Sequence, residues 1–154
     1  CVISDNKYAK GLGYAKKFKI EKKVFRFDRE YKNEKKILEF LKRNQVFLIC
    51  LAGFMKILSK KFIKSYQGKI INIHPSLLPK YKGLNTHYKA IINNDKFSGC
   101  TVHYVNKYLD SGKIIFQKKV RITKRDTEKS VEKKVLKIEH KIYPKAINKV
   151  LSNL

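Results

Sequence analysis

The chain has 154 residues, a length typical of one globular domain, and its 43% of hydrophobic residues suffices for a core of ordinary size. Its longest apolar run, Val46–Met55, is about half of the roughly 20 residues needed to span a bilayer, and no signal or transit segment is recognisable. These features predict one domain over residues 1–154 and exclude a membrane partner.

The formal charge of +25 arises from 37 Lys and Arg against 12 Asp and Glu, yet only five basic residues are Arg. Nucleic-acid-binding proteins use the forked guanidinium group of Arg and usually cluster their positive charges. In this chain the lysines are instead scattered through every segment. We therefore expect no nucleic-acid partner, although small anionic ligands are attracted to any cleft in such a field. The three widely spaced cysteines form no C-x-x-C pair, which favours a reducing, cytoplasmic location and argues against a zinc site.

Apolar β-branched runs alternate with helical patterns, which is typical of an α/β fold. Strands are predicted at residues 1–4, 23–26, 45–54, 69–74, 99–105 and 113–122. Helices are predicted at residues 11–18, 28–44, 59–66, 86–93 and 127–151, with Asp28 and Ser59 as N-caps and a kink at Pro144. The run at 45–54 is apolar throughout, as in strands that a parallel sheet buries on both faces.

The stretch "INIHPSLLPKYKGLNTH", Ile71–His87, carries the first candidate site. Asn72 and His74 lie two residues apart on a strand, so both side chains project from one face at its carboxyl end, where open α/β sheets bind ligands. Pro75 ends the pairing there. An amide beside an imidazole can form an oxyanion hole or a general acid. The alternative, that both side chains only satisfy the strand end and the loop, stays open.

A second candidate, Asp110, lies in the turn of "TVHYVNKYLDSGKII" close to Gly112. An exposed carboxylate there can reach a neighbouring imidazole, raise its proton affinity and fix its orientation. Asp110 can equally be an ordinary turn residue. The spacings of His74, His87 and His103 match no compact metal motif, so we expect His87 in the first turn of a helix and His103 on a strand in a supporting role.

The motifs "LAGFMKIL", "NIHPSLLPKYKGLNTHYKAI" and "GCTVHYVNKYLDSGKIIFQKKV" stand in an order and spacing that resemble the phosphoribosylglycinamide formyltransferase family. The resemblance runs from "CVISDNK" to "IEHKIYP", nearly the whole chain. It implies a Rossmann-like, open, mostly parallel sheet with flanking helices. It also implies transfer of the formyl group of 10-formyltetrahydrofolate to the amine of 5-phosphoribosylglycinamide, with no metal and no covalent intermediate.

The same resemblance assigns residue roles. It implies that Asn72, His74 and Asp110 are catalytic, and that Pro75 and Glu139 lie on the ribonucleotide side. The implied folate contacts are Arg29, Met55, Lys56, Ile57, Leu58, Asn72, Asn106, Lys107, Tyr108, Leu109 and Asp110.

The family also begins with a strand and a G-x-G-S-N loop that binds the ribonucleotide phosphate, and this pattern is not found before Cys1. The "GLG" at Gly11–Gly13 lacks the Ser-Asn, and we interpret it as a turn entering a helix. We therefore expect an N-terminally incomplete domain, missing one strand, that binds folate better than ribonucleotide and is poorly stable or inactive.

Three other functions compete with this hypothesis. A methionyl-tRNA formyltransferase carries an additional C-terminal barrel, and a formyltetrahydrofolate deformylase uses water in place of the amine. A basic, non-catalytic RNA-binding scaffold would need an Arg and aromatic cluster, which the sequence does not offer. The oligomeric state stays open.

Overall fold

The structure is a computed structural model that describes residues 1–25 and 31–153, with only the backbone of residues 31 and 32. The chain divides into two compact units. The smaller comprises Cys1–Phe47 and Leu58–Gln67, and the larger comprises Leu48–Ile57 and Gly68–Leu154.

The smaller unit contains a short βαβ element followed by two helices. Strands β1 (Val2–Ser4) and β2 (Lys22–Val24) pair in parallel on either side of α1 (Lys10–Lys17). Gly11 and Gly13 lie inside α1, so the "GLG" motif belongs to the helix itself rather than to a turn before it. Helices α2 (Tyr31–Arg43) and α3 (Lys60–Ser65) complete the unit. Its buried side chains include Leu12, Ala15, Ile37, Leu41 and Phe62.

A buried carboxylate links the two later helices of this unit. Glu34 of α2 accepts hydrogen bonds from the N–H of Ser59, at 2.8 Å, and from the Ser59 hydroxyl. The same hydroxyl accepts from the N–H of Phe62 and thereby caps α3. The predicted N-cap at Ser59 is confirmed, whereas the predicted cap at Asp28 lies outside the described residues.

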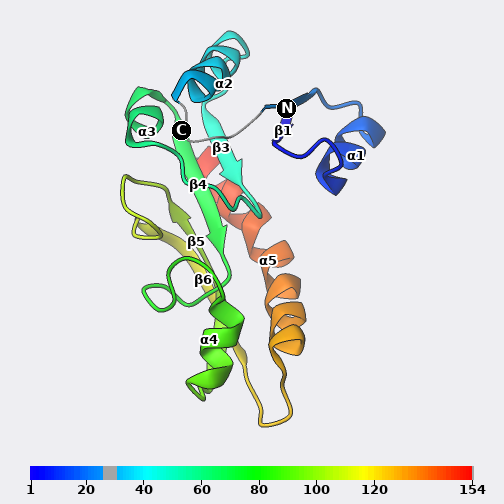
Figure 1. The fold of residues 1–154 in the computed structure, drawn as a ribbon, viewed down its shortest axis with the longest axis vertical. Helices are drawn as coiled ribbons and strands as arrows, with labels where there is room; N and C mark the ends of the chain where they lie inside the picture. Colours follow the sequence, from blue (N-terminus) through cyan, green and yellow to red (C-terminus); the bar gives the residue numbers. More distant parts are fainter. Residues whose placement is uncertain (26–30, 154) are drawn as a thin grey trace. The chain divides into compact units, whose positions relative to one another are not determined.

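The larger unit is a four-stranded sheet with one long helix along it (Figure 1). Its elements are β3 (Leu48–Leu51), β4 (Lys69–His74), α4 (Thr86–Ile92), β5 (Phe97–Tyr104), β6 (Ile114–Arg121) and α5 (Glu128–Leu151). The strand order is β3-β4-β5-β6, with β3 and β4 parallel and the other two pairings antiparallel. The α/β fold with flanking helices is confirmed, and the sheet is mixed in direction.

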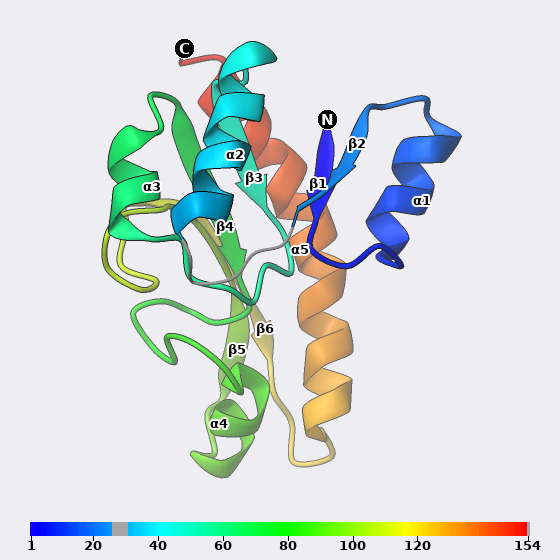
Figure 2. The ribbon, with the colours of Figure 1, turned by 45° about the horizontal axis from the view of Figure 1, so that its top comes forward.

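Successive side chains of β5 point to opposite faces of the sheet, so one set lies in the core and the other lies toward the site. Helix α5 covers one face of the sheet (Figure 2). Cys100 and Val102 pack against apolar side chains of this helix. Thr101 and His103, the alternate residues, point to the opposite face. Burying a Val side chain contributes roughly 1.5–3 kcal/mol, so the α5 contacts fix the register of β5 and thereby aim the polar residues. The α5 residues in these clusters include Val131, Val135, Ala146 and Val150.

Helix α5 runs without interruption from Glu128 to Leu151, through Pro144. The predicted helix is confirmed, and Thr127 caps its N-terminus with a side chain that accepts from the N–H of Ser130. The ring of Pro144 removes one N–H donor from the helix without ending it.

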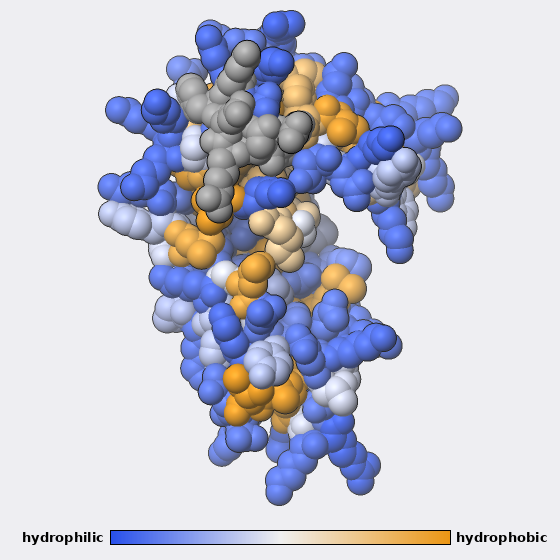
Figure 3. All heavy atoms as spheres, in the orientation of Figure 1, coloured by the Kyte–Doolittle hydropathy of each residue, from blue (hydrophilic) through white to orange (hydrophobic). Residues whose placement is uncertain are grey.

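The face drawn in Figure 3 is dominated by hydrophilic side chains, with a few apolar groups. Exposed apolar or aromatic side chains include Leu84, just before α4, and Tyr88 and Ile92 within it. None of the helices within residues 1–25 and 31–153 is long and apolar enough to span a membrane.

Candidate active site

The end of β4 presents two polar side chains to the face of the sheet that α5 leaves free. Asn72 pairs in register with His103 of β5, and His74 with Thr101. β4 ends at His74, so the predicted strand end is confirmed. Asn72 is half-buried, whereas His74 and His103 are buried, and Asn72 Nδ2 lies 3.4 Å from His103 Nε2.

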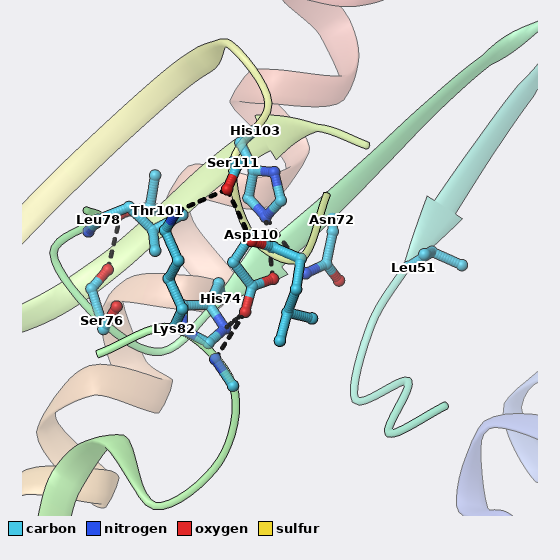
Figure 4. Close-up of polar contacts among 12 residues, drawn as sticks. Leu51, Asn72, His74, Ser76, Leu78, Lys82, Thr101, His103, Asp110 and Ser111 are labelled. Carbon is cyan, nitrogen blue, oxygen red and sulfur yellow. Dashed lines mark hydrogen bonds and ion pairs between the residues drawn. The ribbon is translucent and has the colours of Figure 1, made fainter. Parts of the chain in front are cut away.

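Asp110 approaches this pair from the turn between β5 and β6 (Figure 4). Its Oδ2 lies 3.4 Å from His74 Nδ1, and its Oδ1 lies 3.6 Å from His103 Nε2. The N–H of Gly83 donates to Oδ2 at 2.8 Å. The Asp110 side chain is only 8% exposed, and its φ of 44° lies in the left-handed region that costs a non-glycine residue about 1 kcal/mol or more. These contacts compensate for that strain.

The charge state of Asp110 follows from these neighbours. Burial raises the pKa of its carboxyl, but hydrogen bonding from His103 and from the Gly83 N–H, together with the charges of both imidazoles, lowers it by more. The pKa therefore lies below its ordinary value, and the carboxylate is ionised near neutral pH.

Both ring nitrogens of His74 face acceptors. Nε2 lies 2.8 Å from the carbonyl oxygen of Tyr81, and Nδ1 faces the Asp110 carboxylate. An imidazolium, which carries a proton on each nitrogen, satisfies both contacts at once. The two acceptors therefore orient the His74 ring from two sides.

Most of the predicted folate residues lie in two segments, Met55–Leu58 and Asn106–Asp110. Met55 and Ile57 are 74% and 78% exposed and Lys56 is exposed, whereas Leu58 is buried. Asn106–Leu109 are exposed and lead directly into Asp110. Apart from Asp110, neither segment contributes a side chain to the polar cluster of Asn72, His74, His103 and Asp110 that the structure describes.

The two residues predicted on the ribonucleotide side, Pro75 and Glu139, are not members of this cluster. Pro75 is half-buried directly after His74, and Glu139 is half-buried on α5. Burial raises the pKa of Glu139, which the charge of His140 offsets in part. Arg29 lies outside the described residues. His87 falls in the first turn of α4, as predicted, and His103 lies on β5 beside the site.

Some contacts of the site had no signal in the sequence. The Tyr81 carbonyl and the Gly83 N–H are backbone groups, and any residue type supplies them. Thr101 had a weak signal, because a hydroxyl in an otherwise buried strand needs partners. Within the described ranges, no group of three His, Cys, Asp or Glu side chains is placed to hold a metal ion.

Comparisons with known proteins extend over most of the chain. A family model described as formyl transferase matches residues 1–147. Phosphoribosylglycinamide formyltransferase of Haemophilus influenzae is 45% identical over 150 residues, which cover 96% of this chain and 71% of that protein. The trifunctional purine biosynthetic protein adenosine-3 of Bos taurus is 40% identical over 155 residues, 98% of this chain and 15% of that protein.

Solved structures agree with these relatives. The crystal structure of phosphoribosylglycinamide formyltransferase from Anaplasma phagocytophilum superposes with a TM-score of 0.93 at 42% identity, covering 99% of this chain and 74% of that chain. The corresponding enzyme from Brucella melitensis gives a TM-score of 0.90 at 42% identity, over 97% of this chain and 78% of that chain. The chain therefore belongs to the formyl transferase family and, within it, to the phosphoribosylglycinamide formyltransferases.

Proposed function

We propose that the protein transfers the formyl group of 10-formyltetrahydrofolate to the amine of 5-phosphoribosylglycinamide, a step of purine biosynthesis. The relatives from Haemophilus influenzae and Bos taurus carry names of this activity and of this biosynthesis. The observation that carries the proposal is the polar cluster at the end of β4, where Asp110 lies between two buried imidazoles beside the Asn72 amide. Such a cluster combines donors for an oxyanion with a carboxylate that stabilises a protonated imidazole.

The reaction needs donors at the formyl oxygen. The amine nitrogen attacks the formyl carbon, the bond from that carbon to the folate nitrogen breaks, and negative charge develops on the oxygen in between. We assign the stabilisation of that charge to the Asn72 amide N–H and to the protonated His74. Removing one such donor commonly costs about 2.7–4 kcal/mol of transition-state stabilisation.

The two nitrogens of His74 take different roles in this proposal. Nε2 donates to the Tyr81 carbonyl at 2.8 Å, which anchors the ring. Nδ1 makes the longer contact of 3.4 Å with Asp110, so it is the nitrogen that can be shared with the substrate oxygen.

Asp110 acts in the proposal as a fixed negative charge. Because its pKa lies below the ordinary value, it remains ionised at neutral pH, and its negative charge stabilises positive charge on the His74 ring during the reaction. It also orients a water molecule that passes the proton of the attacking amine to the departing folate nitrogen. The products are a formamide and a folate amine, so protons and charges balance.

We also propose which residues contact the two substrates. Arg29, the loop Met55–Leu58 and the loop Asn106–Asp110 are assigned to the folate, and Pro75 and Glu139 to the ribonucleotide. The positive field of a chain with net charge +25 favours both anionic substrates. The formyl donor is a cosubstrate rather than a resident cofactor, and we propose a cytoplasmic location because all three cysteines are free.

One assay tests the proposal against its nearest rivals. The purified protein is incubated with 10-formyltetrahydrofolate and, separately, with 5-phosphoribosylglycinamide, with methionyl-tRNA, or with water as the only acceptor. We expect deformylation of the folate with the ribonucleotide alone, with a formylated ribonucleotide as product. Equal turnover with water would indicate a deformylase, and turnover with the charged tRNA would indicate a tRNA formyltransferase.

A further inference from the structure

A buried polar network joins β5 and β6 to the loop that follows His74. It consists of Ser76, Leu78, Thr101 and Gln117, and we call it the Thr101 network. Figure 4 labels the first three of these residues. Thr101 is fully buried, and Ser76 is 2% exposed. The network lies on the face of the sheet that α5 leaves free, next to the polar cluster of the site.

Every hydrogen-bonding position of the Thr101 hydroxyl is used. It donates to the carbonyl of Ser76 at 2.7 Å and accepts from the N–H of Leu78 at 3.1 Å and from Gln117 Nε2 at 2.8 Å. A hydroxyl has one donor and two acceptor positions, so the group is saturated.

Gln117 completes the network from the neighbouring strand. Its Nε2 donates to the Thr101 hydroxyl and, at 2.9 Å, to the carbonyl of Leu78. These two bonds use both N–H groups of the Gln117 amide. Gln117 is itself exposed, so its amide reaches the network from the solvent side of β6. Residues 76–78 are thus held from two strands.

The network continues along the loop to the site. The Ser76 hydroxyl donates to the carbonyl of Lys80 at 2.6 Å, and the next residue, Tyr81, has a φ of 55°. With this backbone conformation the Tyr81 carbonyl points back toward β4, and its oxygen lies 2.8 Å from His74 Nε2, within hydrogen-bonding distance. A shift of residues 76–80 therefore displaces the acceptor that orients His74.

We propose that Thr101 and Gln117 are positioning residues for His74. They hold the loop so that the Tyr81 carbonyl stays hydrogen-bonded to Nε2 of His74. Nδ1 of His74 then remains directed at Asp110 and the substrate. The kinetic consequence rests on the proposed formyl transfer, whereas the effect on the His74 ring does not.

Two variants and two controls test this inference. Thr101→Val removes the hydroxyl at nearly constant volume, and Thr101→Ser keeps it. Gln117→Met removes both N–H donors at an exposed position, and Gln67→Met is the matched exposed control. Each variant is assayed for kcat and KM, and the Nε2 proton of His74, assigned with His74→Gln, is followed by NMR for its exchange with water.

We expect Thr101→Val and Gln117→Met to lower kcat by about 10- to 100-fold with KM changed less than twofold, because a displacement of about 1 Å at a catalytic group can cost that much. We also expect the Nε2 proton to exchange at least 10-fold faster in both, while Thr101→Ser and Gln67→Met resemble the wild type. An unchanged exchange rate in folded Gln117→Met would overturn the inference, and so would an equal loss in Thr101→Ser. If the wild-type protein transfers no formyl group, the exchange measurement still decides the question.

Discussion

At the scale of single residues, Asp110 gives the site its charge and depends on its partners for that charge. Its pKa is depressed in the folded protein, so the carboxylate stabilises the fold at pH values above the ordinary pKa of about 3.9. This stabilisation is lost as the pH falls through the lower folded-state pKa. Protonation of Asp110 therefore lowers the free energy of unfolding.

Asp110→Asn removes that charge with almost no change of shape. We expect the variant to be less stable than the wild type at pH 7, and we expect the difference to shrink as the pH falls through the lowered folded-state pKa, below which the wild-type carboxyl is also neutral. Urea unfolding at a series of pH values measures it, with the exposed Asp5→Asn as control. A difference that grows on acidification would contradict the direction of the pKa shift.

The candidate residues were predictable from sequence to different degrees. Asn72 and His74 were found from their spacing at a strand end, and Asp110 from its turn, and the structure brings the three together. The acceptor at Nε2 of His74 was not predictable, because the Tyr81 carbonyl has no side-chain signature. The roles of these residues stay predictions until the variants are measured.

At the scale of elements, the β5–β6 turn places Asp110. Gly112 lies in this turn, and a Cβ at its position would come within 1.7 Å of the Tyr104 carbonyl oxygen. Backbone atoms cannot give way by that amount without moving the turn. Gly112 therefore fixes the path of the chain from β5 to Asp110.

We expect Gly112→Ala to destabilise the protein by at least about 2 kcal/mol and to lower kcat, because overpacking against backbone forces the turn to shift. Gly13→Ala is the matched control: nothing lies within 4 Å of its added methyl, and in a helix the change should stabilise by about 0.5–1 kcal/mol. Denaturant unfolding followed by circular dichroism measures both. Equal stability of the two variants would contradict the close approach at Tyr104.

The N-terminus of α5 supplies a second prediction at this scale. Thr127 and Ser130 form a reciprocal capping box, with contacts of 3.0 Å and 3.3 Å. We expect Thr127→Ala to lower the free energy of unfolding by about 1 kcal/mol, while Thr127→Ser, which keeps the hydroxyl, changes it by less than half as much. Calorimetry on the three proteins provides the comparison, and an unaffected Thr127→Ala would mean that the cap does not stabilise α5.

Element types were more predictable than pairing directions. The range of β4, Lys69–His74, follows from its apolar run and from Pro75, which cannot extend a central strand. The antiparallel pairing of β4 with β5 has no such local signal, since it depends on contacts between segments far apart in the sequence. Helix α5 continues through Pro144 because its packing on the sheet outweighs one lost hydrogen bond, and the kink expected there stays a prediction.

At the scale of the whole molecule, the net charge of +25 is the dominant feature. Mutual repulsion of the lysines destabilises the folded chain, and salt screens it, since the Debye length falls from about 30 Å at 0.01 M to about 8 Å at 0.15 M. We expect Tm to rise between these ionic strengths in differential scanning fluorimetry.

A charge variant provides the control for this effect. Lys118 and Lys133 are exposed, and replacing both by Glu changes the charge by two each, from +25 to +21. The double variant should show a weaker dependence of Tm on salt. A Tm that falls with salt in the wild type would indicate that attractive ion pairs outweigh the repulsion.

The overall fold was predictable because strand and helix patterns alternate along the whole chain. The family resemblance supplied the Rossmann-like arrangement, which the solved relatives confirm. The division of the described residues into two compact units was not predicted, because composition changes little along this lysine-rich chain. The chain spans 71% of the length of its Haemophilus influenzae relative and 78% of that from Bacillus subtilis.

The central claim is that His74, held between Asp110 and the Tyr81 carbonyl, stabilises the charge on a transferred formyl group. The most direct test is the single-turnover rate of formyl transfer from 10-formyltetrahydrofolate to 5-phosphoribosylglycinamide, with wild-type protein and with folded His74→Ala at saturating substrates. The account predicts a rate about 10²–10³-fold lower in the variant. A rate within twofold of the wild type would contradict it.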